Sequence, residues 1–301
     1  VKASFFEWEG RKVKRLVGSV LERKSGRPTG VHVRVESKVF VASCGAINSP
    51  ALLLRSGLSS NGRVGKRTML HPVVALPGIY EEEINPYYGA PQSASSHQFV
   101  DRGTDRVGFF LETAPVHPVL GSLGFSEFGA PQGEFMKQLP HTGVLLGLAV
   151  DGILPNDEGG TVGLREDGRI QLDYPIGAHL QECFREAHYR MAQVELEAGV
   201  KKAVTLHVDK VEIESKSDLG KLKDAQYGAL KHAIFSAHQM GGCAMGGNRE
   251  LSVVDSTLRY YGLDNLFVVD GSVFPTALGV NPSQTIYGLA RWATHFVADR
   301  I

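Results

Sequence analysis

The chain has 301 residues, a length typical of two domains or of one large domain. Its 32 Lys and Arg side chains balance 32 Asp and Glu side chains, so no net charge attracts it to nucleic acid or to an anionic membrane. With 43% hydrophobic and 21% charged residues, the composition is that of a globular protein and excludes a disordered or fibrous one. The longest apolar runs, such as residues 145–150, are too short for a transmembrane segment.

Cysteine content and the first residue bear on the compartment and on the extent of the protein. Cys44, Cys183 and Cys243 form no CxxC pair, and an odd number cannot all pair within one chain. A reducing compartment is therefore favoured, with the cytoplasm slightly preferred. The sequence begins with Val1 and shows no leader, so we expect the natural protein to start upstream.

Strands separated by turns are predicted in the first part of the chain, followed by one helix. Alternating β-branched residues predict three strands: residues 12–17, 31–35 and 38–42. The helix is expected to be capped by Asn48 or Ser49, to hold Pro50 in its first turn and to stop at Gly57. This order predicts a strand, a tight glycine turn and a helix.

The middle of the chain, residues 70–177, has short apolar runs broken by Pro and Gly, which predicts an antiparallel sheet with long connections. Its clearest hairpin joins residues 161–164 to residues 169–172. A helix ending at Gly199 follows. Its buried stripe, at spacings of four and three, is Leu180, Phe184, Ala187, Met191, Val194 and Ala198.

The last part returns to strands at residues 251–254 and 266–269 and ends in a helix. Asn281 is expected to cap this helix and Pro282 to occupy its first turn. Its predicted buried face is Ile286, Leu289, Ala290, Ala293, Phe296 and Val297.

Several common catalytic motifs are absent. No two glycines are separated by one residue, so the GxGxxG dinucleotide fingerprint is missing. Residues 57–63 resemble a P-loop but have Arg where that motif requires Lys. No GxSxG elbow and no HExxH motif occurs, and the histidines lack metal-ligand spacing, so no metal site is predicted.

Three segments near the end of the chain contain the remaining candidate catalytic and binding residues. His238 leads into paired glycines, Asp270 ends an apolar strand, and Asn281 precedes a helix. Singly, each has an ordinary structural explanation. Together they suit flavin chemistry, because a neutral His can accept an alcohol proton and a helix N-terminus stabilises the negative charge of a reduced flavin.

At these residues the sequence resembles the GMC (glucose–methanol–choline) oxidoreductases, FAD-dependent alcohol oxidases and dehydrogenases. Residues 45–58 resemble the family's second signature. This sequence departs from that signature only at the next position, Ser59, where Gly is usual. The stretch from His238 to Ile286 resembles the family's C-terminal segment almost throughout. The resemblance implies an α/β fold, with part of a Rossmann-like FAD/NAD(P)-binding domain and an α+β substrate domain built on an antiparallel sheet.

The resemblance also implies roles for individual residues. His238 matches the active-site base, and Asn281 matches the position that orients the substrate oxygen. The cofactor-binding positions that it implies are Asp270, Gly271, Pro282, Ser283, Gly45 and Ala46. The implied domains are residues 1–70 and 231–301 for the FAD-binding domain and residues 71–230 for the substrate domain.

The implied reaction is oxidation of an alcohol, a CH–OH donor, to an aldehyde or ketone by hydride transfer to flavin N5, with His238 as base. The sequence around His238 favours a long-chain or other apolar alcohol as the small-molecule substrate. Leu145, Leu146 and Leu148 are candidates to line the pocket for this alcohol. An N-terminal segment with the GxGxxG loop is missing, so we expect the 301-residue chain alone to bind FAD poorly. The alternatives are a non-catalytic fragment or interaction module that keeps the fold without flavin and, lower in rank, a hydrolase using Ser236, His238 and Asp270.

Overall fold

The structure is a computed structural model that describes residues 1–90, 92–124, 127–154 and 157–301. The chain folds into two compact units. Unit 1 comprises residues 1–70, 156–175 and 237–301, and unit 2 comprises residues 71–155 and 176–236. The predicted substrate domain is residues 71–230, whereas the hairpin after residue 156 lies in unit 1 of the structure.

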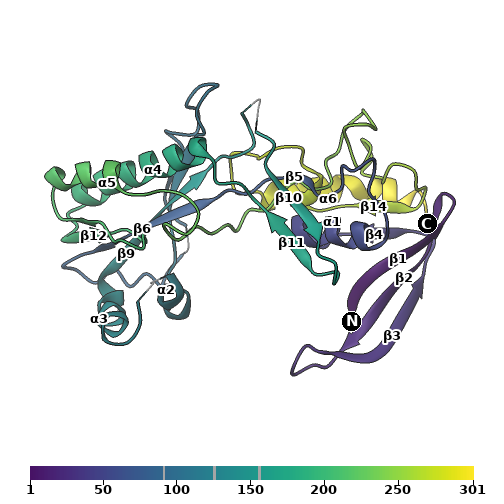
Figure 1. Cartoon of the computed structure of the whole chain (residues 1–301), viewed down its shortest axis with the longest axis horizontal. Coiled ribbons are helices and arrows are strands. Elements are labelled where there is room, and N and C mark those ends of the chain that lie inside the picture. Colours follow the sequence, from purple (N-terminus) through teal and green to yellow (C-terminus); the bar gives the residue numbers. More distant parts are fainter. Residues whose placement is uncertain (91, 125–126, 155–156) are drawn as a thin grey trace. The chain divides into compact units, whose positions relative to one another are not determined.

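The described residues of unit 1 form three small sheets, two helices and a 3₁₀ turn (Figure 1). Its elements are β1 (Lys2–Glu9), β2 (Lys12–Leu21), β3 (Pro28–Glu36), β4 (Phe40–Ala42), α1 (Gly45–Arg55), β5 (Lys66–Thr68), β10 (Gly160–Leu164), β11 (Ile170–Asp173), β14 (Leu266–Val268), η3 (Gly271–Val273) and α6 (Ser283–Ala298).

The first sheet is antiparallel, in the order β1-β2-β3. Strands β2, β3 and β4 confirm the three predicted strands, but β1 was not predicted. Its pairing with β2 shifts register between Ala3 and Phe5 and again between Glu7 and Trp8. Such bulges interrupt the two-residue alternation by which a strand is recognised in a sequence.

A parallel pair, β4 and β14, carries the core of unit 1, with Phe40 opposite Leu266 and Ala42 opposite Val268. This pairing brings together strands more than 200 residues apart in the sequence. The predicted strand at residues 251–254 is wrong, because there Val254 forms only isolated bridges.

Helix α1 begins earlier than predicted, at Gly45 rather than near Pro50. Neither Asn48 nor Ser49 is its N-cap, a position that Cys44 occupies. The early start is stabilised from outside the helix: Asp270 accepts a hydrogen bond from the Gly45 N–H (2.9 Å), and the Ser49 hydroxyl accepts one from the Cys44 N–H (2.9 Å). These bonds satisfy donors that a helix N-terminus otherwise leaves unpaired.

The predicted hairpin is confirmed as β10 and β11, with Leu164 opposite Ile170. Strand β10 also pairs with β5, where Gly160 lies opposite Thr68. Because β5 belongs to the first 70 residues, this pairing joins the hairpin to unit 1.

Unit 2 is built on a six-stranded antiparallel sheet in the order β13-β12-β6-β9-β8-β7, as the predicted substrate domain requires (Figure 1). Its elements are β6 (Val73–Ile79), β7 (Ser95–Ser96), β8 (Phe109–Thr113), α2 (Pro118–Gly124), α3 (Ala130–Gln138), η1 (Leu139–His141), β9 (Thr142–Ala149), α4 (Ala178–Glu197), β12 (Lys202–Val204), β13 (Glu212–Ile213), η2 (Lys216–Gly220) and α5 (Lys221–Asp224).

Helix α4 covers one face of this sheet. A Cβ atom on Gly147 of β9 would lie 2.8 Å from the Cβ of Ala187, so only glycine permits this close approach of strand and helix. The predicted stripe is confirmed as far as Met191, but Val194 is exposed and Glu195 is buried in its place. The buried face drifts because about 3.6 residues make one turn.

Helix α6 begins at Ser283, two residues after the predicted cap Asn281. Of its predicted apolar face only Ala293 is buried, while Leu289 packs at the edge of the core and Tyr287 and Trp292 are exposed. Ala293 belongs to the buried core of unit 1, which also contains Phe40 and Ala42 of β4 and Val268 of β14. Among the described residues, no helix has the length and apolar character needed to span a bilayer.

Candidate active site

Asp270 is the central hydrogen-bonding group of unit 1. It follows β14, is buried, and accepts hydrogen bonds on both carboxylate oxygens. Its Oδ2 accepts from the Gly45 N–H (2.9 Å) and the Ser49 hydroxyl (2.5 Å), and its Oδ1 accepts from the Ser272 N–H (2.8 Å). The carboxylate therefore fixes the start of α1 against the turn at residues 270–273.

Gly271 is the point where the other two predicted segments meet. A Cβ atom at this position would lie 3.1 Å from the carbonyl oxygen of Gln239 and 3.2 Å from Cδ1 of Ile286. The Gly271 carbonyl in turn accepts a hydrogen bond from the Gly241 N–H (3.0 Å). The segment that follows His238 and the first turns of α6 thus pack against the same buried glycine.

The paired glycines after His238 serve contacts within unit 1. Gly241 has φ +75°, and a Cβ there would lie 2.0 Å from the carbonyl oxygen of Arg67. Gly242 has φ +94° and lies against Pro50 of α1. Both positions therefore require glycine for the approach of protein backbone and side chain, which fixes the path of the chain immediately after His238.

His238 is half-buried, and burial lowers its pKa from the usual 6.5. Removing the ring from water disfavours its charged form, so the imidazole is neutral at about pH 7. A neutral imidazole has one ring nitrogen able to accept a proton. The environment of His238 therefore suits a general base.

Asn281 immediately precedes the Pro282 N-cap of α6 and does not cap the helix as predicted. The N-cap side chain of α6 makes no capping hydrogen bond. The Oδ1 atom of Asn281 is buried and has no hydrogen-bond partner among the described residues. A buried amide oxygen left unpaired is costly and is a recognised mark of a ligand-binding position.

The residues of unit 1 fit one part of an FAD molecule. The first turn of α6 contains no acidic residue, and its uncapped N–H groups form the positive end of a 16-residue helix next to Asn281. Ser283 at its start is exposed. The start of α1 is different, because Gly45 and Ser49 already donate to Asp270. Unit 1 thus offers donors suited to the flavin ring, whereas the chain has no GxGxxG loop for the diphosphate.

A buried cluster of rings in unit 2 was not predicted. Rings of His188, His207, His232 and Tyr227 lie with centroids 4.8–6.2 Å apart. Burial lowers the pKa of His188 to about 3 and that of His207 to about 4, so both are neutral at about pH 7. They come from α4 and from two loops, and no spacing in the sequence reveals that they meet.

Comparison with known proteins decides the family. The GMC oxidoreductase family matches this chain over residues 6–73 and again over residues 158–290. The chain belongs to the GMC oxidoreductase family. The two matches include both stretches on which the sequence resemblance rests, and membership in this family implies FAD as the cofactor.

Two curated GMC oxidoreductases show the range of relatives. Long-chain-alcohol oxidase FAO4A of Arabidopsis thaliana is 32% identical in an alignment 283 residues long that covers 85% of this chain and 36% of that protein. The 2-methyl-1,2-propanediol dehydrogenase of Mycolicibacterium austroafricanum is 29% identical and covers 90% of this chain, which spans 50% of that protein. The chain thus spans about a third to a half of the length of these relatives.

A solved structure supports the fold. Pyridoxine 4-oxidase from Mesorbium loti aligns with 98% of this chain and 56% of its own, with a TM-score of 0.67 and 22% identity. At this identity the likeness concerns the fold alone. It confirms the α/β class with an antiparallel-sheet domain that the sequence predicted for this GMC oxidoreductase.

Proposed function

We propose that this GMC oxidoreductase takes part in the FAD-dependent oxidation of an alcohol to an aldehyde or ketone, with His238 as the base and Asn281 orienting the substrate oxygen. The observation that carries the proposal is the meeting of the His238–Gly241 segment and of α6 at Gly271. This contact joins the segment that begins with the neutral imidazole of His238 to the helix that follows Asn281, whose buried amide oxygen has no partner among the described residues.

Each residue has a defined task in this mechanism. The neutral imidazole of His238 accepts the hydroxyl proton of the alcohol. The Asn281 amide, which has one acceptor and two donors, hydrogen-bonds the alcohol oxygen and holds it in place. When bound, FAD accepts the hydride that the alcohol carbon loses. The N-terminus of α6, at Pro282 and Ser283, would stabilise the negative charge of the reduced flavin.

Asp270, Gly271, Gly45 and Ala46 belong to the cofactor side of this proposal. Asp270 positions the turn and the start of α1 through its internal hydrogen bonds, while Gly271 keeps the backbone of that turn free of a side chain. Names of relatives in both the oxidase and the diol dehydrogenase classes support an alcohol as substrate. An apolar alcohol agrees with the long-chain-alcohol oxidase among them.

The substitution His238→Ala tests this proposal in the flavin-loaded enzyme. We expect the rate of flavin reduction by substrate, followed by absorbance in a stopped-flow instrument, to fall roughly a hundredfold to ten-thousandfold. His32→Ala, an exposed histidine on β3, is the matched control and should leave the rate unchanged. An unchanged rate in His238→Ala would remove His238 from the mechanism.

The rival interpretation is a non-catalytic protein that keeps the fold without flavin. Visible absorbance of the purified full-length product distinguishes the two. A flavin spectrum at near-stoichiometric content is expected, and a colourless protein that does not take up added FAD would favour the non-catalytic interpretation.

A further inference from the structure

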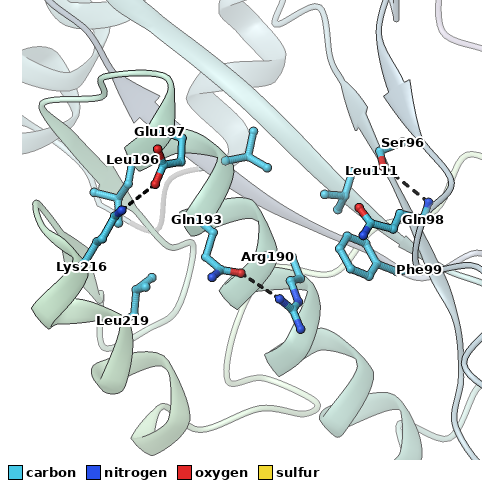
Figure 2. Close-up of a pocket in the computed structure, with 11 residues that line it drawn as sticks. Ser96, Gln98, Phe99, Leu111, Arg190, Gln193, Leu196, Glu197, Lys216 and Leu219 are labelled. Atoms are coloured by element: carbon cyan, nitrogen blue, oxygen red, sulfur yellow. Dashed lines mark hydrogen bonds and ion pairs between the residues drawn. The ribbon is translucent and has the colours of Figure 1, made fainter.

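Unit 2 contains a cavity of about 630 Å³ beside helix α4, within the size range of small-molecule sites. Figure 2 shows Ser96 and Phe99, from the region of the edge strand β7, at one end and Lys216 of η2 at the other. The described residues that line this α4–β8 cavity all belong to unit 2. The proposed alcohol oxidation assigns no role to any of them.

One wall of the cavity is apolar. Leu111 of β8 and Leu219 of η2 line it and are only 5% and 8% exposed. Val194 of α4 lines it as well and is 47% exposed, although helical spacing predicts that this valine is buried. The apolar stripe of α4 thus continues from the protein core into the cavity, where the hydrocarbon part of a ligand would cover it.

The guanidinium group of Arg190 borders this apolar wall. Its Cζ lies 5.3 Å from the centroid of the Phe99 ring, a cation–π contact that restrains the group. Its Nε donates to Glu186 Oε1 (2.8 Å) and its Nη1 donates to Gln193 Oε1 (3.0 Å; Figure 2). A guanidinium has five N–H groups, and the remaining ones of Arg190 have no hydrogen-bond partner among the described residues. Arg190 therefore offers donors to a ligand in the cavity.

A second cation, Lys216, lies at the other end of the cavity. Its Nζ pairs with Glu197 Oε1 (2.7 Å), and the two side chains are 77% and 71% exposed (Figure 2). An ion pair this exposed contributes little to stability, so its rearrangement on ligand binding costs little. Arg190 and Glu197 are seven residues apart on α4, so about 10 Å of helix separates the two ends of the cavity.

These features favour one class of ligand. A hydrocarbon body matches the apolar wall, and a carboxylate matches the N–H donors of Arg190, because guanidinium and carboxylate form paired, charge-assisted hydrogen bonds. The two cations in the described lining, Arg190 and Lys216, outnumber its one carboxylate, Glu197, which disfavours a ligand with an ammonium group. A sugar would leave hydroxyl groups without partners against the leucines.

We propose that the α4–β8 cavity binds a small carboxylate with an apolar body, whose carboxylate group is held by Arg190. The Glu186 carboxylate occupies the Nε side of the guanidinium, so the ligand binds at the Nη2 side. This site is independent of the proposed alcohol oxidation, because it needs neither flavin nor any residue of unit 1.

The first experiment compares three ligands that share one hydrocarbon tail. Octanoate, octan-1-ol and octylammonium are titrated into the full chain in an isothermal calorimeter. Octanoate should bind at least tenfold more tightly than either of the others, and each methylene removed from its tail should weaken binding about fourfold. Equal affinity for the three head groups, or no detectable binding of octanoate, would overturn the proposal.

Variants of Arg190 test the carboxylate contact. Arg190→Gln removes the charge and should weaken octanoate binding at least tenfold, while octan-1-ol binding changes less than twofold. Arg106→Gln is the matched control, because it removes an exposed arginine of unit 2 that is absent from the described lining of the cavity. Equal octanoate affinity in Arg190→Gln and Arg106→Gln would refute the role of Arg190.

A second pair of variants locates the hydrocarbon tail. Val194→Asp, at an exposed side chain where folding is undisturbed, should weaken octanoate binding at least tenfold. Leu123→Asp is the control, because Leu123 lies in a different cavity, whose described lining includes Leu146 but neither Leu145 nor Leu148. Octanoate binding that is lost in Leu123→Asp and kept in Val194→Asp would contradict the assignment of the ligand to the α4–β8 cavity.

Discussion

Replacing Gly271 by alanine tests the contact on which the candidate site depends. The new methyl group would lie 3.1 Å from the Gln239 carbonyl oxygen and 3.2 Å from Ile286 Cδ1, a few tenths of an ångström closer than an ordinary contact. The end of the Ile286 side chain can move aside, but the Gln239 oxygen belongs to the backbone. We therefore expect the strain to displace the segment that follows His238.

The magnitude follows from two opposing effects. Overpacking a buried position costs about 1–3 kcal/mol, whereas the lost flexibility of the unfolded chain stabilises Gly→Ala changes by about 0.4–1 kcal/mol. The net loss in the free energy of unfolding should be about 0.5–2 kcal/mol. Flavin reduction in the loaded enzyme should also slow, by up to about tenfold, because His238 is misplaced.

Tryptophan fluorescence during urea unfolding measures the stability change. Trp8 and Trp292 are the only tryptophans of the chain and both belong to unit 1, so the signal reports the unit that contains Gly271. Gly288→Ala in α6 is the control, since no atom other than its chain neighbours and the backbone of its own helix lies within 4 Å of the added methyl group, and it should raise stability by up to about 1 kcal/mol. If Gly271→Ala is as stable as Gly288→Ala and reduces flavin at the normal rate, the reasoning is refuted.

Three further predictions concern titratable groups. Asp270→Asn replaces a carboxylate oxygen that accepts hydrogen bonds with a donor, so urea unfolding followed by tryptophan fluorescence should show a loss of about 1–3 kcal/mol; an unchanged midpoint would contradict the role assigned to Asp270. The folded pKa of His207, about 4, is below the unfolded value of 6.5, so between these pH values only the unfolded ring binds a proton and stability falls as the pH falls. His207→Phe should therefore reduce the slope of unfolding free energy against pH by about 1.4 kcal/mol per pH unit in this range, measured by circular dichroism against the parent protein; equal slopes would refute the burial argument. The rate of flavin reduction should fall as the pH is lowered, with its midpoint below pH 6.5, because burial lowers the pKa of the base His238; a midpoint at or above pH 6.5 would exclude that shift.

Local patterns in the sequence determined the elements that depend on near neighbours. The β10–β11 hairpin and the apolar stripe of α4 as far as Met191 follow from alternation and helical spacing over a few residues. The same is true of the family, because the stretches that begin at Gly45 and His238 are contiguous motifs. Where bulges break the alternation, as in β1, the sequence pattern yielded no prediction.

Only the tertiary structure decided the features that depend on distant residues. The start of α1 at Gly45 is set by a carboxylate 225 residues later, at Asp270, and the hairpin joins unit 1 because β10 pairs with β5. Asn281 does not cap α6, and its buried amide oxygen has no partner among the residues that the structure describes. Hydrogen bonds and close packing act through space, so neither the order of residues nor their periodicity specifies which distant group will satisfy a given donor or acceptor.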